Sequence, residues 1–280
     1  GGNPMRFEQE VYNQYLTYSS AGKRVAAKLS LFGKRQFLPE LWTLLGSSKM
    51  PETESLGVID IPVNKIVGVA SICGNYSYTV DFLPIDPPSS RFAKTWCSIY
   101  LDYLNEREIA PITCYEYLGQ FYVIDGKIRV SVMKCNGATV ISANVIRILP
   151  SDKDSTQSIQ YYSFLESYNK TGLYQVALCS KYTFEDLQKA MGHDKDYQWT
   201  NQDRYSMLFT LCSVEYGLKM SKLNHLALSP IDAFMFLVEN HSYKEAIRMS
   251  SWQMAKIFKA NKHKLFELGT SMNNKVTLAA

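Results

Sequence analysis

The residues from Asp125 to Ser131 are the part of this chain whose types and spacing could bind phosphate. Asp125 and Gly126 end an apolar run, and Lys127, Arg129 and Ser131 follow. A glycine at a turn lets the backbone approach a ligand closely, and the helix that follows offers free N–H groups and the positive end of its dipole. Arg129, in the first turn of that helix, could bind phosphate through two hydrogen bonds. The pattern predicts a phosphate-binding turn formed by these five residues.

A purely structural interpretation of the same residues remains open. Arg129 could form a salt bridge with Asp125 or Glu116, and Asp125 could accept hydrogen bonds from backbone N–H groups of its own turn. Neither arrangement needs a ligand.

Other chemistry has little support in the sequence. The four histidines, His193, His225, His241 and His263, lie on unrelated segments, and none pairs with a cysteine at metal-binding spacing. The six cysteines are scattered, which favours free thiols in a reducing cytosol. There is no GxSxG, HExxH or P-loop pattern. We therefore predict no metal site and assign no catalytic residue.

Residues 56–150 alternate between short β-branched runs and helical stretches, which predicts an α/β core domain within an α+β chain. Strands are expected at 58–63, 66–69, 112–117, 120–124, 139–141 and 144–149, and helices at 96–105 and 128–135. The turn that could bind phosphate lies between the fourth of these strands and the second helix.

Helical segments flank this domain on both sides. Residues 1–50 predict an N-terminal arm, with one helix over 7–18, an interruption at Gly22 and a second helix to about residue 32. Residues 47–55 are typical of a linker. Residues 155–268 predict a helical domain with helices at 159–171, 205–216, 229–240 and 243–264, a capping box at Thr183 and an N-cap at Ser229.

Positive charge is concentrated in the arm. Residues 1–50 hold seven Lys and Arg against three Asp and Glu, a net +4, whereas residues 51–150 hold eight against ten, a net −2. Such a cluster indicates either a solvated helix face or a contact with the nucleic-acid backbone. A second basic patch near the C-terminus has the same two interpretations. The arm cluster comprises Lys23, Arg24, Lys28, Lys34 and Arg35, and the second patch Lys256, Lys259, Lys262 and Lys264.

The overall composition is that of a globular protein. Of 280 residues, 46% are hydrophobic and 20% are charged, and this composition argues against disorder in most of the chain. No run approaches the roughly 20 apolar residues that span a bilayer, and the first residues lack a signal-peptide pattern. We expect a cytoplasmic protein without a membrane partner.

Three passages resemble the ParB/sulfiredoxin-like superfamily over about a third of the chain. Residues 119–132 are similar to its strand–turn–helix motif, with Asp125, Gly126 and Arg129 at matching positions. Residues 61–66 resemble the family's first strand and residues 109–112 the approach to its next one. The C-terminal part is similar to bacterial proteins that append a helical lobe to a ParB-like domain.

The resemblance implies a ParB/sulfiredoxin-like mixed-sheet domain that binds a nucleotide, together with Mg²⁺, or DNA, in a DNA-associated or regulatory role. Two alternatives stay open: a nucleotide-dependent enzyme of phosphotransferase or nuclease-like type, and an interaction module with a decayed pocket. Ile128 stands where the family has histidine, and Lys127 where sulfiredoxins have cysteine. Both departures argue against catalysis of the family type. A homo-oligomer is compatible with every one of these alternatives.

Overall fold

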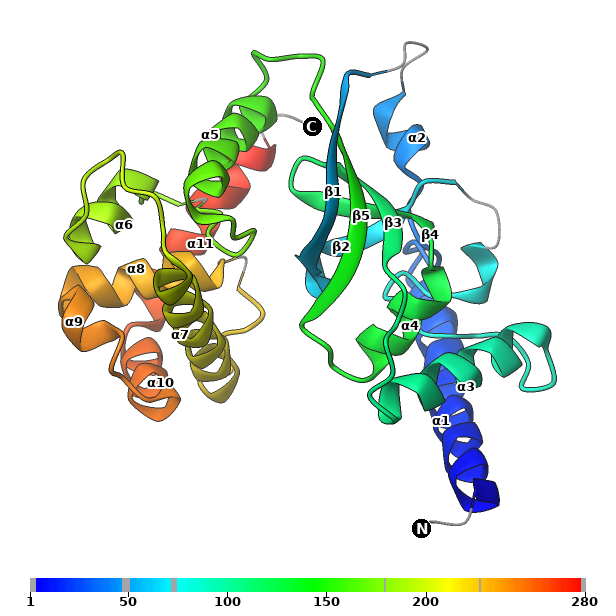
Figure 1. Cartoon of the computed structure of the whole chain (residues 1–280). Helices are drawn as coiled ribbons and strands as arrows, with labels where there is room; N and C mark the ends of the chain where they lie inside the picture. Colours follow the sequence, from blue (N-terminus) through cyan, green and yellow to red (C-terminus); the bar gives the residue numbers. More distant parts are fainter. Residues whose placement is uncertain (1–3, 47–50, 72–74, 179, 227, 278–280) are drawn as a thin grey trace. The chain divides into compact units, whose positions relative to one another are not determined.

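The computed structural model describes residues 4–46, 51–71, 75–178, 180–226 and 228–277, and it divides the chain into two compact units (Figure 1). Residues Gly1–Ser151 form the sheet unit, which combines a five-stranded sheet with helices. Residues Asp152–Ala280 form the helical unit. The α+β class expected from the sequence is confirmed. Within the described residues, no helix is both long and apolar enough to cross a membrane.

The sheet of the first unit is mixed, with the strand order β1-β5-β3-β4-β2. Strand pairs β1–β5 and β3–β4 are antiparallel, whereas β5–β3 and β4–β2 are parallel. The strands are β1 Thr53–Pro62, β2 Ile66–Val69, β3 Ile112–Tyr117, β4 Gln120–Asp125 and β5 Val140–Ile148.

The register of the central strands places the predicted phosphate turn. Thr113 at the start of β3 pairs with Asp125 at the end of β4, so the chain leaves the sheet beside the segment that enters β3. Alternate residues of β3 face the interior, as a half-buried strand requires: Ile112, Cys114 and Glu116 are fully buried.

Among the described residues, four helices complete the sheet unit, together with two short 3-10 helices at Val63–Lys65 and Asn75–Ser77. Helix α1 packs on α3 through Val11, Tyr15 and Trp96, and the Tyr15 hydroxyl donates to the carbonyl of Asp86 at 2.9 Å. The helices are α1 Pro4–Leu31, α2 Leu41–Leu45, α3 Arg91–Leu104 and α4 Lys127–Cys135.

The expected break at Gly22 is wrong, because α1 runs through it without interruption. A Cβ atom at Gly22 would lie 2.3 Å from the carbonyl oxygen of Pro84. The glycine therefore permits a close approach between the helix and the 84–85 segment, and it does not end the helix.

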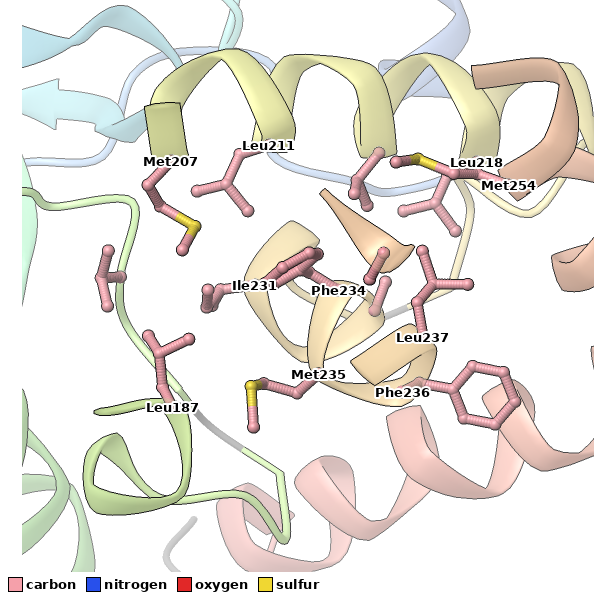
Figure 2. Packing of buried hydrophobic residues seen from close by; sticks show 14 of the residues in the cluster. Leu187, Met207, Leu211, Leu218, Ile231, Phe234, Met235, Phe236, Leu237 and Met254 are labelled. Atoms are coloured by element: carbon pink, nitrogen blue, oxygen red, sulfur yellow. The ribbon is translucent and has the colours of Figure 1, made fainter. Parts of the chain in front are cut away.

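The helical unit is built around an apolar core in which α8 is buried along most of its length (Figure 2). Helices α7 and α10 pack closely against each other in this core. The helices are α5 Thr156–Thr171, α6 Phe184–Met191, α7 Asn201–Met220, α8 Pro230–Asn240, α9 Tyr243–Ala246, α10 Ser251–Ala260 and α11 Lys262–Thr277.

Capping residues decide where these helices begin. Thr183 and Asp186 form the expected capping box of α6, and Ser229 caps α8 with Pro230 at its first position. The single helix expected over 243–264 is wrong, since three helices occupy this region. Ser250 forms a capping box with Gln253 and begins α10, and Asn261 ends it.

Several expected boundaries also differ in the sheet unit. Ser47 to Met50 of the expected linker lie outside the described residues, and Thr53 to Ser55 belong to β1. The two strands expected over 139–149 are one strand, β5. Helix α3 begins five residues before Trp96, because the Ser90 side chain accepts a hydrogen bond from the Ala93 N–H.

Candidate functional site

The turn between β4 and α4 has a backbone conformation that only glycine adopts easily. Gly126 is the N-cap of α4 and has φ 96° and ψ 20°. A Cβ atom at this position would lie 2.6 Å from Cγ2 of Ile112. The glycine is therefore required for packing against the start of β3, whether or not a ligand binds here.

Arg129 is held by groups of the protein itself. Its Nη2 lies 2.5 Å from Oδ2 of Asp125, and its Nη1 donates to the carbonyl oxygens of Ala110 and Pro111 at 2.8 and 2.7 Å. The Arg129 side chain is 18% exposed, whereas that of Asp125 is 75% exposed. The guanidinium thus joins α4 to the segment that enters β3, which is the structural arrangement that the sequence left open.

Ser131 lies apart from the surface of the turn. Its side chain is fully buried, accepts a hydrogen bond from Nε1 of Trp96 at 3.1 Å and donates one to the carbonyl of Phe82 at 2.7 Å. Both bonds tie α4 to α3 and to the 82–90 segment. The structure therefore brings Asp125, Gly126, Lys127 and Arg129 together and places the Ser131 hydroxyl in the interior.

The first helical turn of α4 is the part of this region that could face an anion. Gly126 has no side chain that could accept from the N–H groups of this turn, and no side-chain cap is formed. In contrast, Ser or Thr side chains cap α3, α5, α6, α7, α8, α9 and α10. Lys127 is half-buried at the first position of α4. Backbone donors and the positive end of the helix dipole are what this side of the turn could present to an anion.

A hollow of about 530 Å³ lies beside the segment that Arg129 holds. Residues at the end of α3, in the loop before β3 and on α4 line it, namely Tyr103, Leu104, Glu106, Arg107, Ile109 and Met133. At its edge, Nη1 of Arg107 lies 2.9 Å from Oδ1 of Asp102. The sequence did not single out this hollow, because its walls come from three separate segments.

Lys134 is a further cation of α4, and the sequence did not single it out. Its Nζ donates to the carbonyl of Ile66 at 2.7 Å and lies 5.1 Å from the ring centroid of Phe82. Burial lowers the pKa of this ammonium group from its ordinary value. Lys134 therefore connects α4 to the beginning of β2 and does not point to a ligand.

The five cations of the arm form an exposed basic surface at the end of α1. Gly22 faces the 84–85 segment, so Lys23, Arg24 and Lys28 lie on the solvent side of the helix. The chain turns at Gly33, where the Lys34 N–H donates to the carbonyl of Leu29 at 2.9 Å, and this keeps Lys34 beside the last helical turn.

None of these five cations forms a salt bridge with a described acidic residue. Two exposed apolar side chains, Leu31 and Phe32, lie among them. We call this region the α1 basic surface; it comprises Lys23, Arg24, Lys28, Lys34 and Arg35.

The C-terminal basic patch is also exposed. Lys256, Lys259, Lys262 and Lys264 are all solvent-accessible, and Nζ of Lys256 lies 3.6 Å from the ring centroid of Trp252. A hollow of about 420 Å³ adjoins α10 near Gln253 and includes His241, Lys244 and Arg248 in its lining.

Potential metal ligands can be compared only among the described residues. In the part of the chain that is described, no three His, Cys, Asp or Glu side chains come together as metal ligands. Cys97, Cys114, Cys135 and Cys212 are free thiols, and burial raises the pKa of both Cys114 and Cys135 to about 12. Cys73 and Cys179 lie outside the described residues.

Comparison with known proteins adds no assignment. No protein-family model matches this chain, and no curated protein matches it.

Proposed function

We propose that this chain is a non-catalytic, ParB-like protein of the cytoplasm that binds nucleic acid in a DNA-associated or regulatory role, and that its α1 basic surface contacts the phosphate backbone. The observation that carries the proposal is the set of five exposed cations without a described acidic partner. Cations that are not already paired can release the counterions of a nucleic acid when they bind it, and this release drives association.

The location of these charges supports a polymer as the ligand. They extend from Lys23, in the last third of α1, past the turn at Gly33 to Arg35. Phosphates repeat along a nucleic acid, so an extended row of cations can contact several of them at once. The ring of Phe32 is 68% exposed within this row and could pack against a sugar or a base.

The state of Arg129 supports the same choice. Its three hydrogen bonds to Asp125, Ala110 and Pro111 would have to be exchanged before the guanidinium could bind phosphate bidentately. The cations of α1 require no such exchange.

The test measures binding of a labelled DNA duplex by fluorescence anisotropy. The variant Arg24→Gln/Lys28→Gln is compared with the control Lys153→Gln/Lys195→Gln, which removes the same charge from exposed positions next to acidic residues. We expect weaker binding in the first variant only. Its plot of log K against log salt should also be less steep, with a slope closer to zero by about two. Equal binding by the two variants would overturn the proposal.

A second candidate is a nucleotide whose phosphates bind at the start of α4. The uncapped first turn of α4 beside Lys127 favours it. Calorimetry and thermal shift with ATP, ADP, CTP and GTP, each with and without Mg²⁺, would test this candidate. A bound nucleotide at a hundredfold excess over its dissociation constant should stabilise the chain by roughly 2.7 kcal/mol.

The informative variant for the nucleotide is Lys127→Ala, with Lys153→Ala as its control. Arg129→Ala is a poor choice, because it removes hydrogen bonds that hold the segment before β3. A shift that Lys127→Ala abolishes would establish a nucleotide site at the turn. If no nucleotide produces a shift, this candidate is excluded and the duplex-binding proposal is unaffected.

A further inference from the structure

Helix α7 carries apolar side chains on two opposite faces. Its inner face packs into the core of the helical unit, where Met207, Leu211 and Leu218 are buried (Figure 2). Its outer face exposes a row of large side chains to solvent. This outer stripe of α7 comprises Tyr205 (73% exposed), Phe209 (75%), Cys212 (exposed), Tyr216 (62%) and Met220 (47%).

Such a pattern is unusual for a helix at the surface. A surface helix normally has one apolar stripe towards the core and polar residues on the other side, whereas a helix that is apolar on both sides is covered on both. Contiguous apolar patches of this kind mark interaction sites. The outer stripe therefore indicates that a further surface packs on α7.

The spacing of the stripe fits another helix. Successive members are four, three, four and four residues apart, from position 205 to position 220. Apolar residues that alternate in steps of three and four form the seam along which two helices interlock. Helix α7 has 20 residues and is long enough for such a seam.

We propose that the partner is α7 of a second copy of this chain, so that the protein is a homodimer. A twofold interface brings the same surface of both copies together and must complement itself. The stripe meets this requirement because none of its members is charged and Cys212 is its central member. In an antiparallel pair, Phe209 of one copy lies against Tyr216 of the other, and the two Cys212 side chains meet near the twofold axis.

The size of the stripe suffices for a specific dimer. An aromatic side chain can bury about 150–250 Å². Three aromatic rings that are each more than 60% exposed, together with Met220, give roughly 500 Å² on each copy. The sum of about 1,000 Å² reaches the lower bound for a biological interface.

The test is the molar mass of the full chain, measured by light scattering and sedimentation over a wide concentration range. We expect the mass of two chains for the wild type and of one chain for Phe209→Glu/Tyr216→Glu. The control Leu31→Glu changes a side chain that is 85% exposed on α1, and it should remain dimeric. Circular dichroism confirms that each variant is folded.

Cys212 provides a second readout that does not depend on destabilising the interface. Mild oxidation should link two chains through Cys212 in the wild type, and Cys212→Ser should remain a dimer that no longer cross-links there. A wild-type monomer at all concentrations would overturn the proposal. A dimer that Phe209→Glu/Tyr216→Glu leaves intact, or one that never cross-links at Cys212, would overturn it equally.

Discussion

Arg129 connects the first turn of α4 to the chain that enters β3. Its guanidinium donates to two backbone carbonyls, of Ala110 and Pro111, and to the Asp125 carboxylate. Each hydrogen bond from this largely buried guanidinium to a carbonyl contributes about 0.5–1.5 kcal/mol, whereas an ion pair whose acid is 75% exposed contributes little. At the scale of single residues, the carbonyl contacts and not the ion pair should hold this region.

Arg129→Ala should therefore lower the free energy of unfolding by about 1–3 kcal/mol, because two hydrogen bonds from the largely buried guanidinium are lost. Asp125→Ala removes only the exposed ion pair and should cost less than about 1 kcal/mol. Urea unfolding of both variants measures the difference. Equal losses would contradict the structural role of the guanidinium.

Gly126 and Gly119 are a second pair of positions at which the effects of two substitutions can be compared. Both have positive φ, but a Cβ at Gly119 would meet nothing within 4 Å, whereas one at Gly126 would lie 2.6 Å from Ile112. Gly119→Ala should destabilise the chain by about 1–2 kcal/mol through backbone strain alone. Gly126→Ala should cost clearly more in the same thermal or urea unfolding experiment. A smaller loss at Gly126 would mean that the turn adjusts freely.

At the scale of elements, a buried ion pair joins β3 to β5. Nε of Arg147 lies 2.6 Å from Oε2 of Glu116, and the other Glu116 oxygen accepts from the Gly119 N–H at 2.7 Å. The Glu116 side chain is completely buried. Glu54 of β1 adds a longer contact to Arg147 at 3.5 Å and is half exposed. The sheet thus depends on the Glu116 carboxylate, which compensates the buried guanidinium.

Glu116→Ala leaves the Arg147 charge buried without its main partner and should cost about 3–5 kcal/mol of the free energy of unfolding. Glu54→Ala should cost less than about 1 kcal/mol, because its carboxylate is largely solvated. Denaturant unfolding distinguishes the two variants. Similar small losses in both would show that water compensates Arg147 and would refute its burial.

Asp186 and Glu239 are two of the carboxylates that make the helical unit sensitive to acid. Hydrogen bonds from the Thr183 hydroxyl and N–H hold the pKa of Asp186 below its ordinary value of 3.8, and hydrogen bonds from Lys181 and Tyr182 hold that of Glu239 below 4.5. A carboxylate with a lowered folded-state pKa stabilises the fold above its ordinary pKa. This contribution is lost as the pH falls through the lowered value.

The free energy of unfolding should therefore decrease below about pH 4.5, and the decrease should be smaller in Asp186→Asn/Glu239→Gln. Urea unfolding at a series of pH values, followed by far-ultraviolet circular dichroism, provides the measurement. An identical pH dependence in the wild type and the variant would exclude these two groups as its cause.

Local signals predicted many elements but not their ends. β-Branched runs and the cap at Ser229 located β3, β4 and α8 closely, because strand alternation and capping are encoded within a few residues. The role of Gly22 cannot be predicted locally, since it depends on Pro84, which is distant in sequence. The split after Ala246 was missed because the whole 243–264 segment has helical composition.

The candidate site shows the same limit. Its sequence pattern brought Asp125, Gly126 and Arg129 together correctly at one turn. The carbonyls that accept hydrogen bonds from Arg129 come from the 110–111 segment. The hydrogen-bond partners of Ser131 come from Trp96 and Phe82. Such tertiary partners cannot be deduced from local spacing, so the sequence could not show that this guanidinium and this hydroxyl were already engaged.

At the scale of the whole molecule, the two surfaces proposed to bind partners lie on different units. The sheet unit carries the α1 basic surface, and the helical unit carries the outer stripe of α7. If both proposals hold, each dimer presents two α1 basic surfaces, and two linked contacts bind one nucleic acid more tightly than either does alone. The nucleic-acid contact is the central claim, since the function depends on it.

The salt dependence of duplex binding by the full chain tests that claim most directly. If all five cations of the α1 basic surface contact phosphates, log K should fall with log salt with a slope of about −4 to −5 per chain. Between roughly 50 and 200 mM salt the affinity should then drop about 500-fold. A slope near zero, or no binding at the lowest salt, would contradict the account.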